Sequence, residues 1–145
     1  MPGHLILSAP WLDVTMTNPE IQPMEYDDPF LGLKECIYAG QRYAGPDDPT
    51  DPKISPIYGN LKGLCPITLF VGTRDLMLPD CRKLKRLADE AGTPLNYREY
   101  EGMLHDWIML RLAESQEALG EVAEILEGLK AKSPIREAVS PLDCK

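Results

Sequence analysis

Residues 67–107 constrain the fold most, because they contain two strand-like runs that each lead into a loop with one ionisable residue. The first run, Ile-Thr-Leu-Phe-Val, is apolar and rich in β-formers, and Gly72 closes it, which predicts a buried strand over 67–72. The second run, at 95–100, alternates as a second strand would. Apolar residues between the two runs recur at spacings of three and four, which indicates a helix. Strand, helix and strand with short connections predict a right-handed βαβ unit.

Three helices can be placed from their end signals. The helix of the βαβ unit should open at Pro79 and end at Gly92, because proline suits the first helical turn and glycine suits the left-handed residue that follows a helix. A second helix is predicted over about 30–43, with Asp28 as its N-cap. A third is predicted over 115–131. Its apolar residues at helical spacing are Leu119, Val122, Ala123, Leu126 and Leu129.

The two ionisable residues of the βαβ unit should meet. Parallel strands bring their exit loops to one edge of the sheet, and ligands bind at that carboxyl edge in open α/β sheets. Asp75 follows the first strand and His105 follows the second, about thirty residues later. A carboxylate beside an imidazole is the orienting half of a Ser-His-Asp triad, in which the acid fixes the imidazole tautomer and stabilises the imidazolium.

The residues around these two positions form longer motifs. One reads Gly-Thr-Arg-Asp-Leu-Met-Leu-Pro-Asp at 72–80, and the other reads Tyr-Glu-Gly-Met-Leu-His-Asp-Trp at 100–107. Together they resemble the acid and histidine motifs of α/β-hydrolases, and the branch they resemble most is the hormone-sensitive-lipase-like esterases and lipases. Segments 8–13 and 55–57 are similar to the same branch. The resemblance therefore covers nearly the whole chain.

The resemblance implies the C-terminal part of an α/β-hydrolase domain: an α/β fold of three layers, with a mainly parallel sheet of about three strands between helices. It implies hydrolysis of a small-molecule carboxylic ester, with Asp75 as triad acid and His105 as general base, and with no metal or organic cofactor. Trp11, Met103 and Trp107 would flank this site and could line an acyl pocket. Packing in the core is the alternative for these three side chains.

The nucleophile that this family uses is absent from the sequence. The family order is Ser…Asp/Glu…His with the serine in G-x-S-x-G, and neither that motif nor a His-Gly-Gly-rich oxyanion segment occurs in the 145 residues. Ser8 stands near the end of a strand but lacks the glycines of a nucleophile elbow. Besides a hydrolase part whose serine lies elsewhere, two hypotheses remain open: a non-catalytic truncated fragment or interaction module, and one half of a split hydrolase.

Other ionisable residues near the predicted site have simpler interpretations. Asp80 competes with Asp75 for the acid role, but it falls in the first turn of a helix, where a carboxylate suits the helix dipole. Asp106 is adjacent to the histidine in sequence and is not expected to face it. Asp13 is expected to fix its own loop, and His4, at the start of a strand, is expected to be structural.

The segment at 4–9 predicts a third strand, apolar along its length and parallel to the other two. Nothing in the sequence before it can supply a second neighbour, so we expect a homo-oligomer or a partner chain to cover this edge. Residues 1–132 are expected to form the hydrolase portion, with an irregular cap-side excursion and one helix at 17–56. Residues 133–145 are expected to be a loosely ordered tail.

Composition excludes several classes of function. The sequence has 15 Lys+Arg against 23 Asp+Glu and a net charge of −8, which argues against nucleic acid and anionic membranes as partners. No basic region precedes an early apolar run, so no signal peptide is expected, and no stretch approaches the roughly 20 apolar residues of a membrane span. The four cysteines form no C-x-x-C pair and no metal spacing, which predicts free thiols and a cytoplasmic location.

Overall fold

The computed structural model describes residues 2–132, in which three parallel strands form one sheet in the order β1-β2-β3. The register places Ile67 between Leu5 on one side and Leu95 on the other. The predicted strands are confirmed, and the first is one residue shorter at each end than expected. Their bounds are β1 Leu5–Ser8, β2 Ile67–Gly72 and β3 Leu95–Tyr100.

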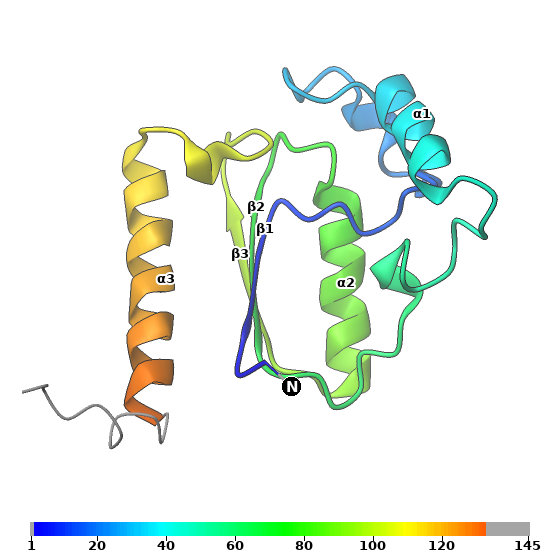
Figure 1. Ribbon diagram of the computed structural model, residues 1–145. Helices are drawn as coiled ribbons and strands as arrows, with labels where there is room; N and C mark the ends of the chain where they lie inside the picture. The colour runs from blue at the N-terminus through cyan, green and yellow to red at the C-terminus, as the bar shows by residue number, and fades with distance from the viewer. Residues whose placement is uncertain (1, 133–145) are drawn as a thin grey trace, which may run out of the picture.

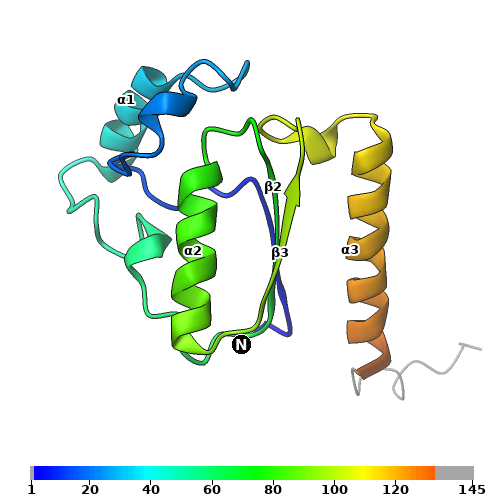
Figure 2. The same cartoon turned by 180° about the vertical axis from the view of Figure 1, so that it is seen from behind.

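Helices lie on both faces of this sheet, which gives three layers (Figure 1). One face is covered by α2 and the other by α3, while α1 lies beyond the end of α2, above the ends of the strands. The view from behind shows the same arrangement, with α1 on the α2 side of the sheet (Figure 2). The helices are α1 Leu33–Ala44, α2 Leu78–Ala91 and α3 Ala113–Lys132, with 3-10 turns η1 Gln22–Met24, η2 Pro56–Tyr58 and η3 Trp107–Met109.

Helix α2 has the end signals that its sequence predicts. Pro79 stands in its first turn, and Gly92 follows its last residue with a left-handed φ of 68°. The Gly92 amide donates to main-chain carbonyls of the last turn and so satisfies groups that the helix leaves unpaired. The helix therefore has fixed ends, and its N-terminus is held close to the end of β2.

Helix α1 begins later than the sequence predicts. It starts at Leu33, with Gly32 as the extended residue before it, rather than near residue 30. The predicted cap, Asp28, accepts hydrogen bonds from the amides of Phe30 and Leu31, and these bonds form a turn ahead of the helix. The N-cap prediction for Asp28 is therefore wrong, because its carboxylate stabilises the preceding loop.

The core is divided by the sheet into two clusters. Every residue of β2 is buried, as expected for a central parallel strand. On the α2 side, Leu69 and Val71 pack with apolar residues of α1, α2 and the long β1–β2 connection. On the α3 side, Phe70 packs with Trp107, and Ile6 of β1 is partly buried against them.

Helix α3 packs through smaller residues than its apolar pattern suggests. Ser115 and Ala118 are buried, and the Ser115 hydroxyl donates to the carbonyl of Trp107 at 2.8 Å. Leu119 and Leu126, which the pattern places on the apolar face, are 50% and 47% exposed. The short side chains of Ser115 and Ala118 thus form the contact with η3, and the two leucines face away from the core.

Three further sequence predictions can be located in the fold. Cys36, Cys65 and Cys81 are free thiols, whereas Cys144 and the predicted tail at 133–145 lie outside the described residues. His4, which directly precedes β1, pairs with the Thr68 hydroxyl at 2.9 Å near the start of β2, whereas the predicted site follows the ends of the strands. Among residues 2–132, none of the helices combines the length and apolarity that crossing a membrane requires.

Candidate active site

Residues 73–77, which we call the acid loop, connect β2 directly to α2. After Gly72 the chain makes a tight turn in which the Asp75 amide donates to the Gly72 carbonyl at 3.2 Å. The Asp75 carboxylate accepts the Met77 amide at 2.8 Å, and its main-chain carbonyl accepts the Leu78 amide at 3.0 Å. Asp75 is fully buried. These bonds fix the carboxylate at the entrance to α2 before any partner side chain is considered.

Residues 101–106, which we call the histidine loop, follow β3 and are joined to the acid loop by hydrogen bonds. The Arg74 amide donates to the Met103 carbonyl at 2.9 Å, and the Thr73 hydroxyl accepts the Gly102 amide at 2.7 Å. Gly102 has a φ of 72°, in the left-handed region where glycine has no steric penalty. The two loops are therefore hydrogen-bonded into one unit at the carboxyl edge of the sheet.

Within this unit the structure brings Asp75 and His105 together. Nδ1 of His105 lies 3.1 Å from Oδ1 of Asp75 and 3.3 Å from its Oδ2. The His105 side chain is 19% exposed, while the carboxylate is inaccessible to water. With a proton on Nδ1 donated to Asp75, the Nε2 lone pair is free to accept a proton from another group.

The surroundings of His105 favour the protonated ring. Burial lowers the pKa of His105, but the hydrogen bond to Asp75 and the charge of that carboxylate raise it. The charges of Asp106 and Asp28 raise it further, so the His105 pKa lies above its ordinary value. An imidazolium that forms in this site is therefore stabilised.

Asp106 lies closer to the imidazole than the sequence suggests. Its backbone is left-handed, with a φ of 53°. Its Oδ2 is 3.6 Å from Nε2 of His105, and the side chain is 57% exposed. The expectation that Asp106 does not face the histidine is therefore wrong.

Asp28 is the acidic residue near the dyad that the sequence does not identify. One ligand atom each from Asp28, Asp75 and His105 lie within 4.8 Å of one another, a grouping of the kind that could hold a metal ion, and the only such group in residues 2–132. Oδ2 of Asp28 accepts the amide of Leu76 at 3.0 Å. The sequence signal available was an acid in the excursion after the first strand, which ends at the same sheet edge as the other two.

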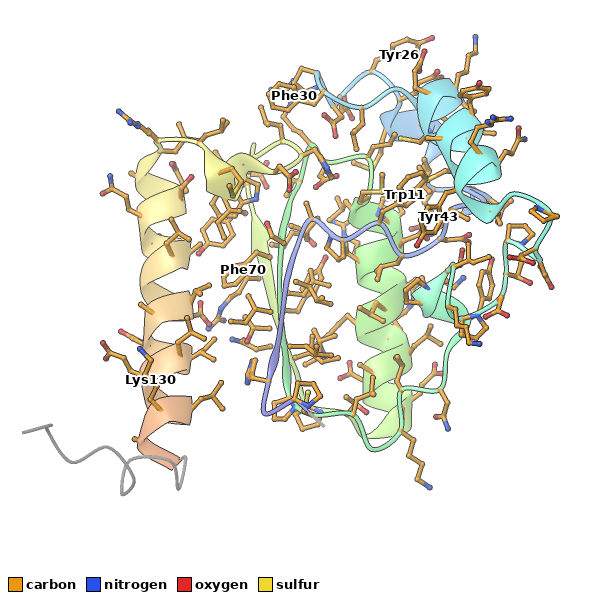
Figure 3. All side chains as sticks on the ribbon, in the orientation of Figure 1. Trp11, Tyr26, Phe30, Tyr43, Phe70 and Lys130 are labelled. Atoms are coloured by element: carbon orange, nitrogen blue, oxygen red, sulfur yellow. The ribbon has the colours of Figure 1, made fainter. Side chains whose placement is uncertain are left out.

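A cavity of about 530 Å³ opens beside the dyad. His105 forms part of its wall, together with Trp11, Phe30, Leu31, Cys36 and Met77. Trp11 and Phe30 both lie on the side of the molecule where the strands end (Figure 3). The wall is largely apolar, and its polar side chains are His105, Asp106, Glu35 and Ser8. A mainly apolar pocket with a few polar groups is typical of sites for small organic ligands.

The three predicted pocket residues do not share one location. Trp11 lines the cavity. Trp107 is 1% exposed and packs against Tyr100, with ring centroids 4.4 Å apart, in the cluster beneath α3. Met103 packs against that same cluster. Trp107 and Met103 thus support the histidine loop from the other side of the sheet.

Asp80, the competing acid, and Asp13 are hydrogen-bonded to groups other than the imidazole. Asp80 is buried in the first turn of α2, where its Oδ1 accepts the Asn18 amide group at 2.8 Å. Asp13 accepts the Thr15 amide and hydroxyl through one oxygen and the Tyr58 hydroxyl through the other. Asp13 thus holds its own loop, as expected from the sequence.

Known proteins are similar to this chain in sequence and in fold. A family model described as alpha/beta hydrolase fold matches residues 1–109. The chain belongs to the alpha/beta hydrolase fold family. An esterase of Acinetobacter venetianus is 32% identical over 133 residues, which cover 89% of this chain and 44% of that protein. An acetyl-hydrolase of Streptomyces hygroscopicus is 29% identical over 107 residues, which cover 74% of this chain and 36% of that protein.

Solved structures of family members superpose on the chain. The crystal structure of EstE5 soaked in ethyl alcohol matches with a TM-score of 0.83 and 30% identity, over 88% of this chain and 44% of that one. An esterase from the bacterial hormone-sensitive lipase family matches with a TM-score of 0.83 and 27% identity, over 87% of this chain and 43% of that one. The sequence-based resemblance is thereby confirmed. The chain spans less than half the length of these relatives.

Proposed function

We propose that this chain supplies the acid and the base of a carboxylic-ester hydrolase. The observation that carries the proposal is the buried Asp75 carboxylate within hydrogen-bond distance of Nδ1 of His105, beside an apolar cavity. Asp75 would hold the tautomer in which Nε2 accepts a proton, and would stabilise the imidazolium formed when it does so. The family relationship to esterases and acetyl-hydrolases supports an ester as the substrate.

In this mechanism the nucleophile is a serine that is not among these 145 residues. Nε2 of His105 takes the serine proton as the hydroxyl oxygen attacks the ester carbonyl, and returns a proton to the departing alcohol. Water then attacks the acyl-enzyme with the same assistance, which releases the acid and regenerates the serine. The cavity walled by Trp11 and Phe30 would hold an apolar group of the ester.

The free edge of β1 is where we propose that further polypeptide binds. Within residues 2–132, β1 pairs with β2 alone, and Leu5, Ile6 and Leu7 are only half-buried. Unpaired main-chain groups beside apolar side chains recruit another strand. A second copy of this chain or a partner chain on residues 4–9 would complete the sheet. This open edge is also the observation that favours the alternative of a non-catalytic interaction module.

A chimera tests the proposed reaction. The part of the Acinetobacter venetianus esterase that precedes its matching region would be joined to this chain, and hydrolysis of p-nitrophenyl acetate would be measured. We expect saturable turnover that His105→Ala reduces roughly 10²- to 10⁴-fold, the usual contribution of a general base. Asp80→Asn, which removes the competing acid, should leave the rate within a few-fold.

A folded chimera without His105-dependent turnover would contradict the hydrolase proposal and favour the interaction module. Circular dichroism of the chimera and of each variant separates this outcome from a failure to fold. Equal losses in Asp80→Asn and Asp75→Asn would mean that the acid has been assigned to the wrong residue.

A further inference from the structure

Asp28 connects the cavity wall to the acid loop through its carboxylate. The residue is 5% exposed and lies in the segment before α1. Its Oδ1 accepts the amides of Phe30 at 2.9 Å and Leu31 at 3.3 Å, and both of these residues line the cavity. Its Oδ2 accepts the amide of Leu76, the residue directly after Asp75, at 3.0 Å. One buried side chain thus fixes two parts of the site relative to each other.

A second bond beside it joins the same two segments. Nε of Arg74 donates to the main-chain carbonyl of Asp27 at 3.1 Å, so two consecutive residues of the segment before α1 are held by the acid loop. The carboxylate of Asp28 accepts three main-chain amides in all, which offsets the cost of burying its charge. These three bonds hold the carboxylate in one orientation beside Asp75.

Two buried carboxylates consequently face one imidazole. Asp75 is hydrogen-bonded to Nδ1 of His105. Asp28 has no hydrogen bond to the ring, but one of its carboxylate oxygens lies within 4.8 Å of a ring nitrogen of His105 and of an oxygen of Asp75. A charge at this distance and depth is poorly screened by water and salt. Asp106 from the same loop is the other titratable group at the ring, and Glu35 and Cys36 of α1 line the same cavity as His105.

We infer that Asp28 is a second positioning acid of this site, which stabilises the His105 imidazolium through space while it ties the cavity wall to the acid loop. A role for Asp28 in catalysis rests on the proposed function, whereas its effect on the His105 imidazolium concerns only residues of this chain. Asp75 orients the ring, and Asp28 adds negative charge without competing for the Nδ1 proton. The same side chain keeps Phe30 and Leu31 in register with the dyad.

The test is an NMR titration of His105 in the 145-residue chain, in a His4→Gln background that leaves one imidazole to observe. Asp28→Asn keeps an oxygen for the amides of Phe30 and Leu31 but removes the charge. We expect it to lower the pKa of His105, by less than Asp75→Asn does. The matched control is Asp27→Asn, which removes the same charge one residue away at an exposed position and should leave the titration unchanged.

Two results would overturn the inference: an unchanged His105 pKa in folded Asp28→Asn, or an equal shift in Asp27→Asn. A purely structural role for Asp28 would alter the exchange of the Leu76 amide but not the titration. If Asp28→Asn does not fold, the wild-type chain decides, because the Asp28 carboxylate carbon should show an inflection at the pKa of His105. An Asp28 carboxylate signal without an inflection at the pKa of His105 would refute the electrostatic interaction between Asp28 and His105. None of these readouts depends on the chimera's activity, so the two proposals fail separately.

Discussion

Gly72, the last residue of β2, packs directly against the main-chain carbonyl of Met103, two residues before His105. A Cβ at position 72 would overlap that carbonyl, which also accepts the Arg74 amide at 2.9 Å. The loops that carry Asp75 and His105 are therefore fitted together through their backbones before their side chains meet. The spacing of the dyad depends on the absence of a side chain at this one position.

Gly72→Ala should therefore destabilise the fold and separate the two loops. We expect a loss of about 1–3 kcal/mol in the free energy of unfolding, the usual cost of forcing an extra group into a packed site. Urea denaturation followed by circular dichroism measures it. The matched control is Gly120→Ala in α3, where an added Cβ meets open space, and it should stabilise the helix by about 0.5–1 kcal/mol. An unchanged midpoint in Gly72→Ala would show that the loops adjust without cost.

The contribution of the His105–Asp75 pair to stability should depend on pH. The pKa of His105 is raised in the folded chain, so the native state binds the proton more tightly than the unfolded state does. The contribution is fully present below the unfolded pKa of about 6.5 and is lost as the pH rises through the higher folded pKa. Urea unfolding between about pH 5 and pH 9 should show this decline in the wild type.

Removing the charge of Asp75 tests whether the His105–Asp75 pair causes this pH dependence. Asp75→Asn should lower the pKa of His105, measured by NMR, and should flatten the decline in stability above about pH 6.5. The matched comparison is Asp80→Asn, which removes another buried carboxylate from the start of α2 without a contact to the ring. A His105 titration that is the same in Asp75→Asn and in the wild type would show that the two side chains are not coupled.

The juxtaposition of Asp75 and His105 could be predicted because topology alone requires it. Once two runs are recognised as parallel strands of one βαβ unit, their exit loops share an edge, and only the residue types in those loops need to be known. The burial of β2 follows from its apolar sequence in the same way. These parts of the fold depend on patterns within about forty residues of chain.

Trp107 and Asp28 could not be predicted because their surroundings are set by distant segments. An apolar residue just beyond a loop can turn to either face of the sheet, and only the packing against Tyr100 beneath α3 decides the direction for Trp107. Asp28 bonds to the amide of Leu76, 48 residues later, and a main-chain donor leaves no trace in the sequence. The dipeptide Asp28-Pro29 is equally typical of a helix start, which is what the sequence predicts there.

The isolated chain should have almost no esterase activity. Without an activated serine, His105 has only water to deprotonate, so we expect the 145-residue chain to hydrolyse p-nitrophenyl acetate no faster than its His105→Ala variant. A saturable turnover that depends on His105 would contradict this. Ser8, which lines the same cavity, would then be the first residue to test, with Ser8→Ala.

Association of the chain should proceed through the edge of β1. Residues 5–8 pair with β2 on one side, and within residues 2–132 no strand pairs with them on the other. Open edges with apolar side chains recruit further strands, so sedimentation velocity of the purified chain should show concentration-dependent dimers or larger species. Ile6→Lys should weaken this association, because a lysine on an edge strand opposes pairing.

Because Ile6 also packs against the cluster that contains Phe70 and Trp107, Ile6→Lys can act through lost core packing as well as through the edge. Gln116→Lys, which adds the same charge at an exposed position of α3, controls for net charge and should leave the association unchanged. Urea denaturation of both variants shows whether the fold survives. Amide exchange then identifies the interface, since association through β1 should slow the exchange of its free amides as the concentration rises. A compact monomer at high concentration, with those amides already protected, would mean that another part of the chain covers the edge.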